Sequence, residues 1–424
     1  MKNKKFMAKF VIKGARRLKG EIEIKGMKNA ATPILAATIL TSEPCLLENL
    51  PKIKDVENMI NILKSLGAKV KNLNNHSLEI CFRDLSLSKL DEEKVGAMRS
   101  SILLLGPLLS RLGRVEIPEP GGCIIGNRPI DTHLYGFKKM GAKIKEERGI
   151  YHLESDFLKG TTIILPEFSV TATENLVMAA VLSKGETTIK LAAAEPHVQD
   201  LCRFLNKMGA KIEGIGTHTL KIKGVKKLRG VKYKIIPDQI EAGTFAALAA
   251  ATKSQIFIKN VNPDHLEIIL LMLERIGVKF DLYKEGLMIH PSINLRSFKL
   301  QVLPYPGFPT DLQAPFAILS TQVRGTSLIH DPLFESRMGY VAELIKMGAN
   351  AIVADPHRVI INGPTPLYGT EIKTFDLRAG AALIIAGLVA HGETIIREAE
   401  IVDRGYEKIE ERLSCLGAEI KRIN

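Results

Sequence analysis

The sequence predicts a mixed α/β protein of two globules, each built from three copies of one repeating unit, with buried helices inside and β-sheets outside. Three observations support this prediction. A short glycine-centred phrase recurs six times along the 424 residues. Each copy follows an amphipathic helical pattern, and a far more apolar helical segment lies upstream of it. The length is also typical of two or three domains, and a hydrophobic fraction of 46% is typical of a globular protein.

The recurring phrase sets the length of the unit. Its glycines are 74, 68, 68, 71 and 69 residues apart, so six units near 70 residues account for the whole chain. The phrases are SLGAKV, MGAKI (twice), IGVKF, MGANA and LGAEI, with the glycines at Gly67, Gly141, Gly209, Gly277, Gly348 and Gly417. Each glycine is expected to close a helix in the left-handed conformation, and a strand is expected to follow.

Each unit also contains one helix that is apolar nearly all round. The six segments are KNAATPILAATIL, MRSSILLLGPLL, TENLVMAAVL, EAGTFAALAAA, TDLQAPFAILS and LRAGAALIIAGLVA. Such helices are buried on every side, and small Ala side chains let them pack closely. The unit is therefore predicted to run strand, buried helix, strand, exposed helix, strand. The alternative is a solenoid of six units. It is less favoured because a fully buried helix in every unit fits closed globules better.

The composition bears on cofactors and location. The five cysteines are widely spaced without a CxxC pair, and no two of the ten histidines lie within four residues of each other. This pattern predicts reduced thiols, no metal and no cofactor. The basic N-terminus lacks the apolar core of a signal peptide, and the longest uncharged apolar stretch, near 379–390, is shorter than the roughly 18–20 residues of a membrane span. A cytoplasmic protein without a membrane span is expected.

The net charge of +13 is compatible with a nucleic-acid binder or with an enzyme for anionic small molecules. The basic residues form no block of five or six, and the chain has no Trp and no RNP-like aromatic cluster. The pattern favours small-molecule substrates over nucleic acid, in a monomer or weak homo-oligomer.

Cations recur where the predicted helices begin. Lys28, Arg99 and Arg378 start buried helices, and Arg128, Arg337 and Arg404 precede exposed ones. Helix starts present unpaired N–H groups and a positive dipole end, so cations added there indicate an anionic ligand such as phosphate. The chain has neither a GxxxxGK[ST] nor a GxGxxG motif, which argues against a P-loop or a dinucleotide fingerprint.

Two acids and one cysteine interrupt this cationic pattern. Asp311 in PGFPTDLQAPF and Glu241 in IPDQIEAGTF are either plain helix-start acids or, among so many cations, general bases for a hydroxyl. Cys123 in PGGCIIGNRP follows two glycines and lies near Arg128. A positive potential lowers the pKa of a thiol and makes it reactive, whereas a buried structural cysteine is the alternative.

In combination these motifs resemble the enolpyruvyl transferases, the family that includes EPSP synthase. The resemblance extends from about Phe10 to the C-terminus and rests on GMKNAATPIL, MRSSI, PGGCIIGNRPID, SVTATEN, IPDQIEAGTF, FPTDLQAPF, FESR, DLRAGAAL and DRGYEKIEERL. It implies an inside-out α/β barrel in each of two globules. Residues 1–27 with 237–424 would form the first globule, and residues 28–236 the second, which would carry the Cys123 loop.

The resemblance also implies a reaction: transfer of the enolpyruvyl group of phosphoenolpyruvate to the 3′-hydroxyl of UDP-N-acetylglucosamine, the first committed step of peptidoglycan synthesis. It implies catalytic roles for Lys28 and Arg404, with Cys123 as acid and Asp311 as base, and alkylation of Cys123 by the antibiotic fosfomycin. Residues that resemble phosphoenolpyruvate-contacting positions are Lys28, Asn29, Arg128, Arg337, Arg378 and Arg404. Those that match UDP-sugar positions are Arg99, Arg128, Pro129, Ile130, Asp131, Thr132, Ser169, Val170, Asp311 and Leu333.

The chain departs from the common family pattern mainly in the part implied to bind nucleotide. Glu167 replaces Lys, Thr171 replaces Gly, Gln239 replaces Arg, and Ala194 stands in AAAEP where AREPE is common. One alternative is therefore the same chemistry on shikimate 3-phosphate, or on another acceptor of a divergent paralogue. Another is a non-catalytic repeat protein that binds nucleotide-sugars or nucleic acid. The PGGC loop disfavours the shikimate acceptor, and the joint presence of the catalytic residue types disfavours the non-catalytic protein.

Overall fold

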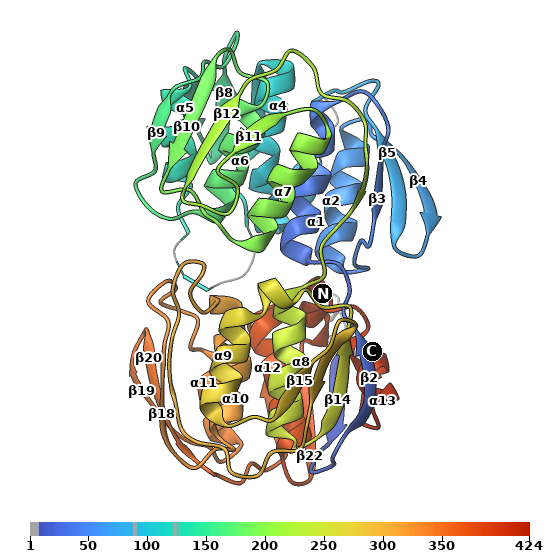
Figure 1. Ribbon diagram of the computed structural model, residues 1–424, viewed down its shortest axis with the longest axis vertical. Coiled ribbons are helices and arrows are strands. Elements are labelled where there is room, and N and C mark those ends of the chain that lie inside the picture. The colour runs from blue at the N-terminus through green and yellow to red at the C-terminus, as the bar shows by residue number, and fades with distance from the viewer. Residues whose placement is uncertain (1–7, 88–90, 122–124, 127) are drawn as a thin grey trace, which may run out of the picture. The chain divides into compact units, whose positions relative to one another are not determined.

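The computed structural model describes residues 8–87, 91–121, 125–126 and 128–424. The chain divides into two compact units (Figure 1). Unit 1 comprises Met1–Lys25, Cys123–Asn127 and Pro237–Asn424, and unit 2 comprises Gly26–Gly122 and Arg128–Ile236. The segment Cys123–Asn127 was expected in the second globule, but it groups with unit 1. Within that unit, Ser336 N donates a hydrogen bond to Ile125 O at 3.2 Å. Cys123 itself lies outside the described residues.

Each repeat contributes one sheet, and a complete repeat has six elements. The last repeat of unit 2 shows the order: β9 (Thr162–Ile164), α6 (Val170–Ala180), β10 (Glu186–Lys190), α7 (Pro196–Lys207), β11 (Lys211–Glu213) and β12 (Thr219–Lys223). Strand β10 runs parallel to β9 and antiparallel to β12, and β11 pairs with β12 at the edge. The predicted unit was one strand short, because the residues after the exposed helix fold into a hairpin rather than a single strand.

The other two repeats of unit 2 each differ from this plan in one feature: the first takes a strand from the far end of the unit, and the described residues of the second form a three-stranded sheet. The first contains α1 (Lys28–Ala37), η1 (Thr38–Leu40), β3 (Cys45–Glu48), α2 (Lys54–Ser65), β4 (Lys69–Asn74) and β5 (Ser77–Cys81). Its fourth strand is β13 (Lys232–Lys234), which comes from the far end of the unit and pairs in parallel with β3. The second contains α3 (Glu92–Ala97), η2 (Arg99–Leu104), α4 (Leu105–Leu112), β6 (Arg114–Pro118), α5 (Asp131–Lys139), β7 (Lys143–Glu147) and β8 (Ile150–Glu154).

Unit 1 repeats the arrangement, and two of its sheets take a strand from the N-terminus. Strand β2 (Lys19–Glu23) pairs with β14 (Gln255–Lys259), and β1 (Lys9–Lys13) lies between β22 (Glu393–Arg397) and β23 (Glu419–Ile423). The remaining elements are α8 (Gln239–Ala251), η3 (Pro263–His265), α9 (Glu267–Ile276), β15 (Phe280–Leu282), β16 (Gly286–Ile289), β17 (Lys299–Gln301), η4 (Thr310–Leu312), α10 (Gln313–Ser320), β18 (Gly325–His330), α11 (Tyr340–Lys346), β19 (Asn350–Asp355), β20 (Arg358–Gly363), β21 (Glu371–Lys373), α12 (Leu377–Val389), η5 (Ala399–Arg404) and α13 (Ile409–Cys415).

The apolar helices form the core of each unit, and the sheets cover them (Figure 1). Every residue of α8 and of α10 is buried, and α8, α10 and α12 pack against one another in unit 1. Small Ala side chains on these helices permit that close approach. The six glycines of the recurring phrase have φ values from 90° to 106°, so the left-handed helix ends are confirmed. The predicted fold class is confirmed and the solenoid is wrong, because the buried helices pack together rather than stack in a row.

The segment predicted as one buried helix from MRSSILLLGPLL is instead divided into a 3-10 helix, η2, and the α-helix α4. Pro107 lies in the first turn of α4, where its missing N–H is not needed for the helical ladder. No helix in the described part of the chain is long and apolar enough to cross a membrane.

Candidate active site

Three of the predicted site residues meet in unit 1. Asp311 lies in η4 just ahead of α10, Arg337 precedes α11, and Arg378 is the second residue of α12. Arg337 Nη2 donates to Asp311 Oδ1 at 2.6 Å, and Arg378 Nε donates to Asp311 Oδ2 at 3.2 Å. Both guanidinium groups are buried, whereas the Asp311 side chain is 22% exposed. Each carboxylate oxygen of the predicted base is therefore paired with an arginine.

A chain of hydrogen-bonded polar groups holds Arg337 in place. Arg337 Nη1 donates to Thr310 Oγ1 at 2.8 Å, and Thr310 donates in turn to Asp331 Oδ2 at 2.5 Å. Asp331 Oδ1 also accepts from the backbone N–H of Leu333 at 3.0 Å. Burial raises the pKa of Asp331. Sequence reasoning missed Thr310 and Asp331, although Thr310 is the direct neighbour of Asp311.

Arg378 is held by neighbouring acids and by Tyr406, and one of its buried nitrogens has no hydrogen-bond partner among the described residues. Burial alone would lower the pKa of Arg378, but Tyr406, Asp311 and Asp238 raise it. The Tyr406 ring centroid lies 5.3 Å from the guanidinium carbon. Arg378 Nη1 is buried and has no hydrogen-bond partner among the described residues. Because a buried donor without a partner is costly, this atom points to a missing acceptor.

In unit 2, Lys28 forms an ion pair at the start of α1. Lys28 is the first residue of that helix, followed by Asn29, and its Nζ lies 2.7 Å from Asp55 Oδ2 on α2. The Asp55 side chain is 3% exposed. Asp55 is a third residue that sequence reasoning missed, because an acid in the first turn of an exposed helix is ordinary.

A second group in unit 2 gathers around the starts of α5 and α6. The Arg99 guanidinium donates to the carbonyl oxygens of Pro120 and Pro129, each at 3.4 Å, and to that of Arg128. Burial and the nearby Arg128 cation lower the pKa of Arg99 to about 10. Ser169 is the N-cap of α6, and its Oγ accepts from Ala172 N at 3.4 Å.

Side-chain contacts tie the two helix starts together. Thr132 Oγ1, on α5, donates to Glu167 Oε1 at 3.0 Å. His133 Nε2 lies 3.1 Å from Thr171 Oγ1 on α6, and Asn175 Nδ2 lies 3.0 Å from His133 Nδ1. Burial, reinforced by the cations Arg99 and Arg128, lowers the pKa of His133 to about 3. The ring is therefore neutral, with Nδ1 accepting from Asn175 and Nε2 donating to Thr171.

The structure thus collects most of the predicted site residues into two groups. Asp311, Arg337 and Arg378 belong to the group in unit 1. Arg99, Arg128, Pro129, Ile130, Asp131, Thr132, Ser169 and Val170 belong to the group around α5 and α6 in unit 2. Arg404 ends η5, and Leu333 is exposed and tied by its backbone to Asp331.

The structure bears on two further interpretations of the sequence, the role of Glu241 and the partners of the cations at helix starts. Glu241 pairs with Arg412 at 2.5 Å and accepts from Lys25 N at 3.1 Å, so it is a structural acid. Of the cations that were expected to bind an anion at helix starts, Lys28, Arg337 and Arg378 have carboxylate partners in the structure. The physical reason is that a buried cation without a counter-charge is strongly destabilising.

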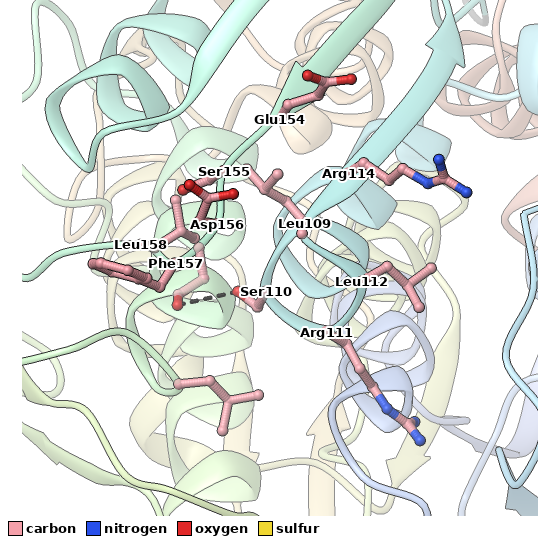
Figure 2. Close-up of a pocket in the computed structure, with 13 residues that line it drawn as sticks. Leu109, Ser110, Arg111, Leu112, Arg114, Glu154, Ser155, Asp156, Phe157 and Leu158 are labelled. Carbon is pink, nitrogen blue, oxygen red and sulfur yellow. Dashed lines mark hydrogen bonds between the residues drawn. The ribbon is translucent and has the colours of Figure 1, made fainter.

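The pocket shown in Figure 2 lies elsewhere in unit 2 and has a volume of about 510 Å³. It is lined by the end of α4, the residues after β8 and the end of α6, with Arg114, Glu154, Asp156 and Phe157 around it (Figure 2). Ser110 Oγ donates to Ala179 O at 3.2 Å at its edge. No predicted site residue lines this pocket, so it is separate from the candidate active site.

Comparison with known proteins decides the family. A family model described as EPSP synthase (3-phosphoshikimate 1-carboxyvinyltransferase) matches residues 12–413. The chain belongs to the EPSP synthase family. Within this family, the UDP-N-acetylglucosamine 1-carboxyvinyltransferase of Koribacter versatilis is 46% identical over 420 residues, which are 98% of this chain and 97% of that one. The protein of the same name from Halothermothrix orenii is 45% identical over 98% of this chain and 100% of its own.

Solved structures of the EPSP synthase family agree with the fold. The enolpyruvyl transferase NikO from Streptomyces tendae matches with a TM-score of 0.90 at 26% identity, over 99% of each chain. EPSP synthase from Acinetobacter baumannii matches with a TM-score of 0.73 at 18% identity, over 99% of this chain and 100% of that one, which shows a shared fold. The family expected from the sequence motifs is therefore confirmed.

Proposed function

We propose that this protein transfers the enolpyruvyl group of phosphoenolpyruvate to the 3′-hydroxyl of UDP-N-acetylglucosamine and releases phosphate. The observation that carries the proposal is the identity of about 45% over nearly the full chain with relatives named for this acceptor. The EPSP synthase from Acinetobacter baumannii is only 18% identical. The expected place of the reaction is peptidoglycan synthesis in the cytoplasm.

The arginines of unit 1 suit the anionic donor. Phosphoenolpyruvate carries a phosphate and a carboxylate, and planar guanidinium groups bind both in bidentate geometry. Arg337 and Arg378 hold the Asp311 carboxylate in the structure, and Arg378 Nη1 is buried without a hydrogen-bond partner in the described part of the chain. We infer that the donor takes over these guanidinium groups and frees Asp311 to act as a base.

Two steps account for the transfer. In the addition, C3 of phosphoenolpyruvate gains a proton, the 3′-oxygen forms a bond to C2, and the hydroxyl proton passes to Asp311. In the elimination, C3 loses a proton and the bond from C2 to the phosphate oxygen breaks. Cys123 is assigned as the acid for C3, while Lys28 and Arg404 stabilise the negative charge that develops on the donor.

The group around α5 and α6 suits the diphosphate of the nucleotide. Side-chain contacts join the starts of α5 and α6 there, and helix starts attract anions through their backbone N–H groups and dipoles. Burial and, after it, repulsion by the neighbouring Arg128 cation lower the pKa of Arg99. A bound anion would relieve this repulsion, so the site gains affinity for phosphate groups from both cations.

A phosphate-release assay with phosphoenolpyruvate and each acceptor separately tests the proposal. Release with UDP-N-acetylglucosamine and formation of its enolpyruvyl ether are expected. Phosphate release with shikimate 3-phosphate but not with UDP-N-acetylglucosamine would identify shikimate 3-phosphate as the acceptor. Steep salt-dependent RNA binding without turnover would instead support a non-catalytic nucleic-acid binder.

A further inference from the structure

Asp200 is a buried acid that the proposed reaction does not use. It lies on α7 and is 1% exposed. Its Oδ1 accepts a hydrogen bond from the Tyr233 hydroxyl at 2.6 Å, and its Oδ2 accepts from Ile236 N at 3.3 Å. Burial raises the pKa of Asp200 to about 6, so the carboxylate is ionised at neutral pH and can only accept hydrogen bonds. Each of its oxygens therefore faces a donor.

Ile236 lies where unit 2 ends, and its backbone contacts the first residues of the same unit. Strand β13 ends at Lys234, and beyond the sheet the partner of Ile236 N is the Asp200 carboxylate. Ile236 O accepts from Met27 N at 2.8 Å. Since unit 2 begins at Gly26 and ends at Ile236, Asp200 holds the backbone at the point where the two ends of the unit meet.

Met27 directly precedes Lys28 and is the N-cap of α1. Its carbonyl oxygen accepts from Ala31 N at 2.9 Å, so Met27 is bonded through its oxygen as well as through its N–H. Gly26 has no room for a side chain, because a Cβ there would lie 1.7 Å from Asn49 O. The backbone that leads into Lys28 is therefore held on both sides.

We propose that Asp200 is a positioning residue that fixes the start of α1, and with it Lys28, through the backbone of Ile236. The inference rests on the proposed function, because it takes Lys28 as a residue that contacts the donor. The ion pair with Asp55 orients the Lys28 side chain, whereas Asp200 fixes the backbone from which that side chain extends. A displacement of about 1 Å near the reacting groups can lower a rate roughly 100-fold.

Two variants of similar size separate hydrogen bonding from packing. Asp200→Leu fills the space but accepts no hydrogen bond. Asp200→Asn keeps an oxygen for Ile236 N and can donate to the Tyr233 hydroxyl, which is also an acceptor. We expect Asp200→Leu to lower kcat/KM for phosphoenolpyruvate roughly 10- to 100-fold, and Asp200→Asn to stay within about threefold of the unaltered protein. If Asp200→Leu does not fold, Asp200→Ser, with its shorter side chain, takes its place with the same expectation.

Amide hydrogen exchange measures the backbone contacts without any turnover. In Asp200→Leu the N–H groups of Ile236 and Met27 should exchange roughly tenfold faster or more, because Ile236 N loses its acceptor and Met27 N is bonded to the same residue. The amides of β10 should keep their rates. Glu213→Gln removes an exposed acid from β11 and should change neither the exchange rates nor kcat/KM.

A double-mutant cycle with Lys28→Gln distinguishes positioning from general destabilisation. Because Asp200 acts through Lys28, Asp200→Leu should cost less than about twofold in kcat/KM once Lys28 has been replaced. A general loss of folded structure would instead lower kcat/KM by the same factor in both backgrounds, and that result would overturn the inference.

The outcomes also separate this inference from the proposed function. Unchanged exchange at Ile236 and Met27 in Asp200→Leu would overturn the inference alone. An unchanged kcat/KM in this variant, with turnover in the unaltered protein, would do the same. Absence of turnover in the unaltered protein would overturn the proposed function, and the positioning role of Asp200 with it.

Discussion

Asp311 Oδ1 accepts a hydrogen bond from Arg337 Nη2 at 2.6 Å, so the proposed base and a proposed ligand of phosphoenolpyruvate are paired with each other. Arg378 holds the second carboxylate oxygen. A base in this state cannot readily accept a proton. Binding of the donor and activation of the base are therefore expected to be one event, because the donor anion replaces Asp311 on the arginines.

The Asp311→Asn variant tests this exchange. We expect kcat to fall roughly 10²- to 10⁴-fold, as for loss of a general base. The free energy of unfolding of the variant should also be lower by roughly 2–4 kcal/mol. This is somewhat less than the cost of removing one partner from a fully buried ion pair, because the Asp311 side chain is partly exposed. Phosphoenolpyruvate should raise its melting temperature more than it raises that of the unaltered protein. A kcat close to that of the unaltered protein would exclude Asp311 as the base.

The Asp55→Asn variant tests whether Asp55 positions Lys28. Loss of the buried carboxylate should leave Lys28 misplaced and reduce kcat/KM roughly 10- to 100-fold, comparable to loss of a supporting residue at other sites. Asp55→Glu should recover part of this loss. Glu57→Gln, which removes an exposed acid from the same helix, should have no effect. Equal effects of the two neutral variants would mean that charge on α2, rather than the pair with Lys28, is responsible.

Thiol reactivity is expected to be selective. Burial raises the pKa of Cys45 to about 11 and that of Cys202 to about 12, so both thiols stay protonated and unreactive near neutral pH. Fosfomycin should give one adduct, on Cys123, as measured by peptide mass spectrometry. Cys123→Asp should resist the inhibitor and keep its turnover. An adduct on the exposed Cys415 instead of Cys123 would contradict the proposed role of the loop.

Acid should destabilise the protein partly through His133. The pKa of this ring falls from 6.5 to about 3 on folding, so its contribution to stability is complete above pH 6.5 and is lost as the pH falls. Between pH 7 and pH 4.5 the free energy of unfolding should drop by roughly 2–3 kcal/mol through this group. Urea unfolding measures this change. In His133→Asn, the free energy of unfolding should fall between pH 7 and pH 4.5 by roughly 2–3 kcal/mol less than it does in the unaltered protein. Identical pH profiles would show that His133 can be protonated in the folded state.

The repeat architecture could be predicted because it depends on local patterns. Helix-ending glycines and fully apolar helices recur at regular intervals, and each pattern has a direct structural cause. The second strand of each hairpin was missed because the predicted unit ended at the strand after the glycine phrase, although a second strand such as β12 alternates exposed and buried residues. The parallel pairing of β13 with β3 joins residues far apart in the chain and has no local signal.

The site was predicted only in part for a similar reason. Residues with an unusual type at a helix start, such as Lys28 and Arg378, could be identified from position and from family resemblance. Their partners could not, because Asp55 and Asp331 stand at ordinary positions for an acid. Their importance comes from burial against a cation or a hydroxyl, which only the folded chain shows.

The most direct test of the proposed reaction is turnover of phosphoenolpyruvate and UDP-N-acetylglucosamine in deuterated water, with the product analysed by NMR and mass spectrometry. The account predicts phosphate and an enolpyruvyl ether on the 3′-oxygen, with deuterium in the vinyl group because C3 is protonated and then deprotonated. Transfer without any deuterium at C3 would contradict the addition and elimination steps. Absence of transfer to this acceptor, with transfer to shikimate 3-phosphate instead, would contradict the proposed function.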